Sequence, residues 1–197
     1  IEQGVLADEV GLDVIELGEH HRSDYVISNP EITLAALASR TKNIKLASGV
    51  TVLSSSDPVR VFENFSMIGL LSDQRTEIIV GRGSFIESFP LYGYDLNYYD
   101  ELFDEKLQLL LQLNKEETIN WKGKFRAPLQ NQQIHPRTIQ KDGIPVWVAV
   151  GGTPASVIRA AKLGLPLIIA IIGGMPYQFK QLTELYKKTY IESGHDE

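Results

Sequence analysis

The chain has 197 residues, of which 43% are hydrophobic and 22% are charged, as is typical of a globular domain that buries a substantial core. Its net charge of −6 argues against nucleic-acid binding, because neutralising phosphates requires clustered lysine and arginine. The absence of cysteine excludes disulfides, thiolate chemistry and cysteine-ligated zinc, and is compatible with the cytoplasmic location that we expect.

Short apolar runs alternate with longer amphipathic segments along the whole chain. The runs predict strands at residues 13–18, 44–53, 77–81, 145–150 and 166–172. The longest apolar stretch, residues 163–175, contains Pro166 and glycines and is too short to cross a membrane. Apolar strands that alternate with helices are typical of a parallel sheet.

The segments between these runs predict helices. Residues 1–11 read as a helix already under way, so we expect the chain to be the interior of a longer protein. Further helices are predicted at residues 30–41, 57–71, 99–113 and 153–164. Asp57 is the expected N-cap of one of them, Thr153 can cap another, and Gly164 ends it.

One stretch, residues 118–143, breaks this alternation. Its first part predicts a hairpin that turns at Lys122 and Gly123, and a Pro- and Gln-rich irregular segment follows. An insertion of this length is more often functional than filler.

Five βα units fit either an open doubly wound sheet or part of a (β/α)8 barrel. A complete barrel typically needs about 250 residues. No dinucleotide-binding fingerprint follows the first strand. We therefore predict an α/β fold of the (β/α)8 TIM-barrel type, incomplete in this chain, with its first strand and last units missing, and residues 1–197 as a single domain.

Small and ionisable residues follow each predicted strand, where chemistry gathers in both architectures. They occupy residues 19–21, 54–58, 81–84, 151–154 and 173–174. Gly151, Gly152 and Thr153 expose amides at a helix start, which suits a phosphate, although a plain βα turn has the same pattern. Arg82 favours the phosphate site, since a guanidinium beside bare amides binds phosphate well; the alternative is an ion-paired surface arginine.

Two adjacent histidines, His20 and His21, follow Glu19 after the first predicted strand. Alternate residues of a strand face opposite sides, so His20 faces the barrel interior and His21 points away. Adjacent histidines cannot easily converge on one metal ion, and we expect no metal site. His20 is either a structural histidine or a catalytic, cofactor-contacting one, because imidazole exchanges protons near neutral pH.

Several stretches together resemble the luciferase-like flavin monooxygenase family, the relatives of the bacterial luciferase alpha subunit. They are "GLDVIELGEHH", "PEITLAALASRTKNIKLASGVTVLSSSDPVRVFENF", "LLSDQRTEIIVGRGSF", "IPVWVAVGG" and "AAKLGLPLIIAII". The combination of EHH, DPVR and GRG is specific, whereas each of the three is a weak signal when it occurs alone.

The resemblance implies a barrel that binds reduced FMN at its C-terminal mouth, supplied by a separate flavin reductase, and a homodimer. It implies that His20 is the catalytic histidine near the flavin ring and that Gly49 and Val50 form a non-proline cis peptide behind the ring. Arg82, Gly83 and Ser84 correspond to one side of the phosphate site. Gly151, Gly152 and Thr153 correspond to the other side, to which Ser156 adds a hydroxyl.

Two positions depart from the family pattern. Gly81 stands where bacterial luciferases carry a reactive cysteine, which argues against light emission. Asp100 stands near the place of a second phosphate arginine, so Arg82 or a loop residue would have to offset its repulsion of the phosphate.

The resemblance implies a flavin-dependent monooxygenase: reduced FMN reacts with dioxygen to give a flavin hydroperoxide, which oxidises a small organic substrate. A deazaflavin-dependent oxidoreductase shares the same barrel and remains an alternative. A non-catalytic flavin-binding protein is a third possibility, because small relatives with shortened barrels bind flavin without turnover. The sequence does not identify the substrate.

Overall fold

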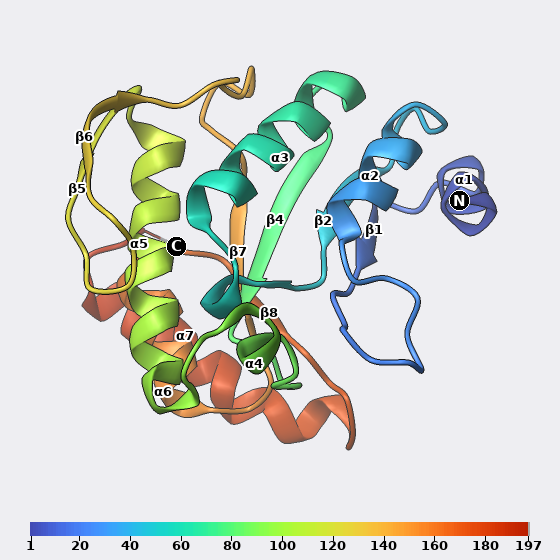
Figure 1. Ribbon diagram of the computed structural model, residues 1–197. Helices are drawn as coiled ribbons and strands as arrows, with labels where there is room; N and C mark the ends of the chain where they lie inside the picture. The colour runs from blue at the N-terminus through green and yellow to red at the C-terminus, as the bar shows by residue number, and fades with distance from the viewer. Residues whose placement is uncertain (197) are drawn as a thin grey trace. The chain divides into compact units, whose positions relative to one another are not determined.

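A computed structural model describes residues 1–196, and the chain divides into two compact units, Ile1–Pro145 and Val146–Glu197 (Figure 1). The helices of the first unit are α1 (Glu2–Glu9), α2 (Pro30–Ala38), α3 (Pro58–Ser72), α4 (Ser88–Tyr92) and α5 (Tyr99–Lys115), with 3-10 helices at Leu53–Ser55 and Leu96–Tyr98. Its strands are β1 (Val14–Leu17), β2 (Lys45–Ser48), β3 (Thr51–Val52), β4 (Thr76–Gly81), β5 (Thr118–Trp121) and β6 (Leu129–Gln133).

The central sheet of the first unit is parallel, as the alternation of runs predicts. β1 pairs with β2, which pairs in turn with β4, and Leu46 of β2 lies opposite Thr76 of β4. β3 also pairs with β4, with Thr51 opposite Val80. All six residues of β4 are buried, which explains why this strand reads as a continuous apolar run.

The single strand predicted at residues 44–53 is wrong in one respect, because it is two strands. β2 ends at Ser48, the peptide bond between Gly49 and Val50 is cis, and β3 resumes at Thr51. β2 therefore pairs with the first half of β4 and β3 with its second half. An apolar run carries no signal of such a break, since both halves are buried.

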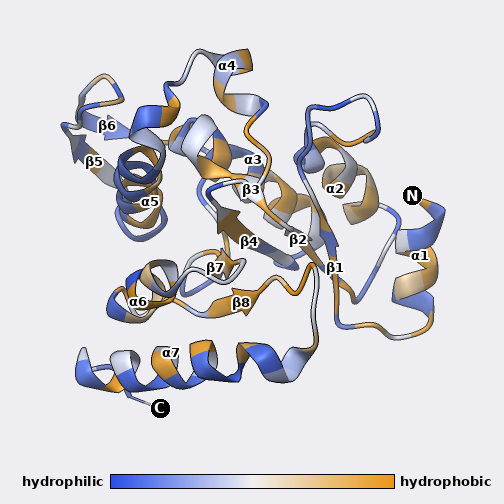
Figure 2. Ribbon diagram, turned by 90° about the horizontal axis from the view of Figure 1, so that it is seen from below, coloured by the Kyte–Doolittle hydropathy of each residue, from blue (hydrophilic) through white to orange (hydrophobic). Residues whose placement is uncertain are grey.

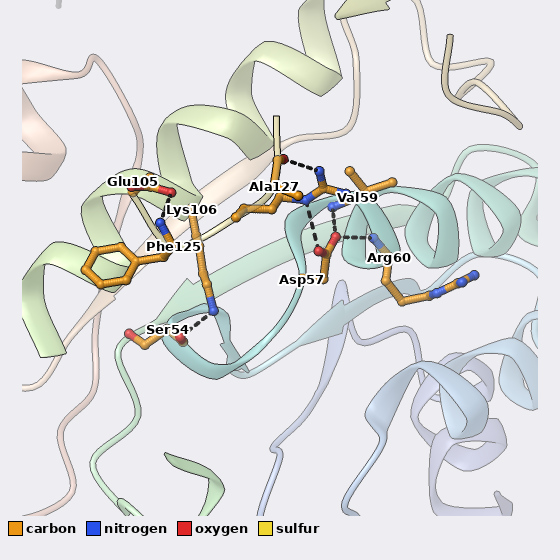
Figure 3. A network of polar contacts seen from close by, with 9 residues as sticks. Ser54, Asp57, Val59, Arg60, Glu105, Lys106, Phe125 and Ala127 are labelled. Atoms are coloured by element: carbon orange, nitrogen blue, oxygen red, sulfur yellow. Dashed lines mark hydrogen bonds and ion pairs between the residues drawn. The ribbon is translucent and has the colours of Figure 1, made fainter. Parts of the chain in front are cut away.

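Helices α2 and α3 cover one face of this sheet and begin where the sequence predicts (Figure 1). Both have proline in the first turn, and the Asp57 side chain accepts hydrogen bonds from the N–H groups of Val59 at 2.9 Å and Arg60 at 3.4 Å (Figure 3). Phe62 and Phe65 of α3 are fully buried. The core of the unit therefore lies between these helices and the sheet.

The hairpin prediction for residues 118–143 is partly wrong. β5 pairs with an antiparallel strand, but that strand is the Gln-rich β6, which was expected to be irregular, and the connection is longer than a turn at Lys122 and Gly123. The pairing register of the two strands shifts between Ile119 and Trp121.

Contacts distant in sequence explain why the connection is long. The Glu105 carboxylate on α5 accepts the N–H groups of Lys124 at 2.6 Å and Phe125 at 3.0 Å. Arg126 donates to Asp57 at 2.9 Å. These bonds attach residues 124–126 to α5 and to the start of α3, so β6 pairs with β5 only after this attached segment.

The second unit repeats the βα pattern. Its elements are β7 (Val146–Val150), α6 (Pro154–Lys162), β8 (Leu167–Ile169), a 3-10 helix at Pro176–Phe179 and α7 (Lys180–Glu192). β7 and β8 are parallel and largely hydrophobic (Figure 2). Gly164 ends α6 with a φ of +66°, as predicted.

Three details of this unit differ from the prediction. Thr153 occupies the N-cap position, but its side chain makes no capping hydrogen bond. β8 ends at Ile169, three residues before the predicted end. Helix α7 was not predicted; it packs against α6, and the Tyr186 hydroxyl donates to the Leu165 carbonyl at 2.8 Å.

Among residues 1–196, no helix is both long and apolar enough to cross a bilayer.

Candidate active site

The loop after β1 is held by Glu19, whose carboxylate bridges two partners. Its Oε1 lies 2.9 Å from His21 Nε2, and its Oε2 accepts the N–H of Val52 in β3 at 2.9 Å. The Glu19 and His21 side chains are only 8% and 6% exposed. The charged group in the EHH sequence thus joins the ends of two strands, and His21 is part of that structural clamp.

His20 has different neighbours from His21, although β1 ends at Leu17 and both histidines lie in the loop after it rather than on the strand. Its ring stacks on Tyr25 with centroids 3.9 Å apart and meets the edge of Phe85 at 4.9 Å. The backbone N–H of His20 donates to the Ile27 carbonyl at 3.0 Å, which closes the loop around the ring. Its buried Nδ1 has no hydrogen-bond partner within the described chain. The imidazole is therefore fixed in orientation but keeps one polar atom for a bound group.

The cis peptide that the resemblance implies is present between Gly49 and Val50. Gly49 donates its N–H to Leu17 of β1 at 2.7 Å. Val50 lies against the end of β4: a Cβ added to Gly81 would come within 2.8 Å of Val50 Cγ2. Gly81 therefore leaves no room for a cysteine side chain while Val50 keeps its place.

Arg82 follows β4 and is held by two adjacent residues at the start of α5. Its Nη1 lies 2.5 Å from Asp100 Oδ1, and its Cζ lies 5.1 Å from the centre of the Tyr99 ring. The Tyr99 hydroxyl donates to the Gly83 carbonyl at 2.6 Å, and burial raises the pKa of this phenol, so it remains a donor. Gly83 has a φ of +82°, which favours glycine, and Ser84 is exposed.

The predicted residues of the first unit therefore gather at one end of its sheet. His20 follows β1, Gly49 and Val50 lie between β2 and β3, and Arg82 follows β4. Strands of a parallel sheet present their carboxyl ends at the same edge, and the contact between His20 and Phe85 joins the first loop to the last.

The other predicted phosphate residues belong to the second unit. Gly151, Gly152 and Thr153 follow β7 and are exposed. Ser156 is buried, and its hydroxyl accepts a bond from Arg159 at 3.5 Å. That these residues bind the same phosphate as Arg82 stays a prediction.

A buried lysine supports the loop that follows β3. Lys106 of α5 is 2% exposed, donates to the Ser54 carbonyl at 2.6 Å (Figure 3) and lies 3.7 Å from the centre of the Tyr94 ring. Burial lowers the pKa of Lys106 to about 8, against the opposing effects of Asp57 and Glu105. Lys106 therefore titrates in an accessible pH range.

We expect this titration to appear in the stability of the protein. Between pH 8 and the ordinary value of 10.5, Lys106 is neutral when folded and charged when unfolded, so the unfolded state binds more protons and stability rises with pH. Relative to Lys106→Met, the free energy of unfolding should rise by on the order of 2 kcal/mol across this window. Urea unfolding of both proteins measures it. The control is Lys115→Met, at an exposed lysine, which should differ from the wild type by the same amount at every pH. A difference in free energy of unfolding between the wild type and Lys106→Met that does not change with pH would contradict the prediction.

Sequence reasoning gave no role to three residues of this site. Glu19 was noted only as part of a charged run, and its bond to Val52 spans 33 residues. Tyr25 and Tyr99 hold the His20 ring and Arg82, respectively. Aromatic residues in loops and first turns carry no local signal for such contacts. For a metal ion, residues 1–196 contain no group of three or more suitable histidine or acidic side chains.

A family model described as luciferase-like monooxygenase matches residues 1–197. The alkanal monooxygenase alpha chain of Photorhabdus laumondii is 29% identical over all of this chain and 54% of its own length. The N-acetyl-S-alkylcysteine monooxygenase of Bacillus subtilis is 31% identical over 84% of this chain and 48% of its own length. The chain thus spans about half the length of the curated relatives that it matches.

Solved structures give the same result for the fold. Monooxygenase RslO1 from Streptomyces bottropensis has a TM-score of 0.89 and 26% identity, over all of this chain and 61% of its own. The oxygenating constituent of 3,6-diketocamphane monooxygenase from Pseudomonas putida, solved with FMN, has a TM-score of 0.84 and 23% identity. This match covers 100% of this chain and 57% of that one. An F420-dependent secondary alcohol dehydrogenase has a TM-score of 0.85 and 18% sequence identity, and the match covers 99% of this chain and 60% of that one. The predicted fold, a (β/α)8-barrel type of which this chain holds part, is confirmed.

Proposed function

Because the chain belongs to the luciferase-like monooxygenase family, we propose that it is a flavin-dependent monooxygenase that uses reduced FMN and dioxygen to oxidise a small organic substrate. Monooxygenases among its relatives and a structural neighbour solved with FMN support this proposal. The observation in this chain that carries it is the buried Nδ1 of His20, which has no hydrogen-bond partner among residues 1–196. The cis peptide between Gly49 and Val50 follows β2, the strand that pairs with β1.

The residues present fit a flavin. The His20 ring is held between aromatic neighbours and offers Nδ1 to a polar atom of the ring system. The backbone at Gly49 and Val50 would support the ring from behind. Arg82 and the amides after it would bind the phosphate on one side, and Gly151, Gly152, Thr153 and Ser156 on the other. The Arg82 side chain is 22% exposed, so it can still be reached.

Bound reduced FMN would supply two electrons to dioxygen, so that one oxygen atom enters the substrate and the other leaves as water. The chain's own residues would orient the flavin, exclude water and move protons. His20 would donate or accept a proton through Nδ1, because imidazole can do both. Tyr25 and Phe85 cover the His20 ring and would limit the access of water to it.

The test is a single turnover in labelled dioxygen. The protein is loaded with photoreduced FMN and mixed with ¹⁸O₂ and a panel chosen from its relatives' chemistry: an aliphatic aldehyde, an alkyl thioether and a cyclic ketone. We expect one ¹⁸O atom in the product of at least one compound. Reoxidation at the rate of free FMN, with no flavin bound, would refute the proposal.

A deazaflavin-dependent oxidoreductase is the second candidate, favoured by the structural similarity to the F420-dependent dehydrogenase. Titration with oxidised FMN and with the deazaflavin separates the two, since each binds with its own absorbance change. A protein that binds FMN tightly but labels no product in ¹⁸O₂ would instead be the non-catalytic flavin binder.

The remaining partners belong to the same proposal. A separate flavin reductase would supply reduced FMN, the protein would act as a homodimer in the cytoplasm, and both compact units would belong to one barrel domain. Sedimentation of the full-length protein tests the dimer.

A further inference from the structure

Arg82, the proposed phosphate residue, already has an anionic partner. The Asp100 carboxylate lies 2.5 Å from Arg82 Nη1. The pair is asymmetric in exposure: the Arg82 side chain is 22% exposed and the Asp100 side chain 63%. The carboxylate is thus the more exposed member of the pair, and the guanidinium is the more buried one.

Tyr99 fixes the position of this pair. Its ring lies beneath the Arg82 guanidinium, 5.1 Å from ring centre to Cζ, and its hydroxyl donates to Gly83 at 2.6 Å. Tyr99 and Asp100 are consecutive residues in the first turn of α5. The start of this helix therefore presents both a support and a counter-charge to one arginine.

A phosphate bound to Arg82 would bring a second negative group to the same guanidinium. Like charges at this separation repel, and a guanidinium shared with a carboxylate offers less net attraction to a dianion. The ring of an oxidised flavin is uncharged, so for oxidised FMN repulsion of this kind acts on the phosphate alone.

We propose that Asp100 determines the affinity of the site for phosphate by competing for Arg82, so that the protein gains little from the phosphate of its cofactor. This inference rests on the proposed function, in which Arg82 binds the flavin phosphate. A weakly held phosphate suits a cofactor that is received from another protein and returned to it.

A purely structural role for Asp100 is the alternative. An acidic residue in the first turn stabilises a helix through its dipole, whether or not a ligand binds. The two roles differ in one measurable way: a structural residue changes the affinity for all flavins equally, whereas a competitor changes it only for a flavin that carries a phosphate.

The experiment titrates oxidised FMN and riboflavin, which share the ring and ribityl chain and differ in the phosphate. Dissociation constants are measured from flavin fluorescence for the wild type, Asp100→Asn, Asp100→Glu and the control Asp142→Asn, an exposed acid whose replacement alters net charge equally. Asp100→Asn should improve FMN affinity by about tenfold or more relative to riboflavin. Asp100→Glu and Asp142→Asn should keep the wild-type ratio.

Adding Arg82→Met to Asp100→Asn should abolish the gain, because the gain acts through Arg82. An Asp100→Ser variant provides the same comparison if the asparagine variant does not fold. An unchanged FMN-to-riboflavin ratio in the neutral variants overturns the inference and leaves the proposed function standing. Failure of both flavins to bind any of the proteins overturns the proposed function, and this inference with it.

Discussion

Replacement of His20 by alanine is expected to lower the rate of substrate oxidation by about 10²–10⁴-fold, the usual contribution of a positioned proton-transfer group. The His20 ring is held by Tyr25 at 3.9 Å and Phe85 at 4.9 Å, with Nδ1 buried and unpartnered among the described residues. Oxygen transfer from dioxygen requires protons, since the second oxygen atom leaves as water. The rate is measured in single turnovers of photoreduced FMN, alongside the dissociation constant of FMN.

Two comparisons separate proton transfer from other roles. His20→Gln keeps a hydrogen-bonding side chain but cannot exchange a proton as imidazole does. It should therefore bind FMN as the wild type does, while its oxidation rate stays as low as that of His20→Ala. His135→Ala replaces an exposed histidine and should leave both quantities unchanged. Wild-type turnover by His20→Ala would remove this residue from the mechanism and leave it a packing role.

Arg75→Met is expected to destabilise the protein by about 3 kcal/mol or more, because it leaves several buried acceptors unpaired. The guanidinium donates to four carbonyls: Ser72 at 2.7 Å, Ile44 at 2.6 Å, Thr41 at 3.0 Å and Ala38 at 3.2 Å. It thereby joins the ends of α2 and α3 to the start of β2. Burial lowers the pKa of Arg75, against the opposing effects of nearby acids, yet the group stays charged.

Urea unfolding measures this effect, with two variants for comparison. Arg75→Lys keeps the charge but not the planar fork, so most of the loss should remain. Arg40→Met removes an exposed arginine close in sequence and should cost less than about 0.5 kcal/mol. A loss for Arg75→Met as small as that for Arg40→Met would show that the four bonds contribute little.

The βα order and the helix starts could be predicted because their signals are local. The apolar run of β4, the proline of α3 and its Asp57 cap each act within a few residues. The break between β2 and β3 could not be read from the residues themselves, since both halves are equally apolar; only the family resemblance indicated it.

The features that could not be predicted depend on contacts between segments distant in the sequence. Glu19 bonds to Val52 across 33 residues, and Arg82 pairs with Asp100 across 18. That Arg82 or a loop residue offsets the repulsion between Asp100 and a phosphate stays a prediction. The ion pair itself could not be read from the sequence, and the proposed competition for phosphate starts from its geometry. The roles of the ten proposed site residues stay predictions.

A crystal structure of the full-length protein with FMN tests the central claim most directly. The proposal predicts the flavin ring against Gly49 and Val50, with a polar atom within hydrogen-bond distance of His20 Nδ1 and the phosphate beside Arg82. Flavin bound at another face of the molecule, or a His20 ring turned away from it, would contradict the proposal.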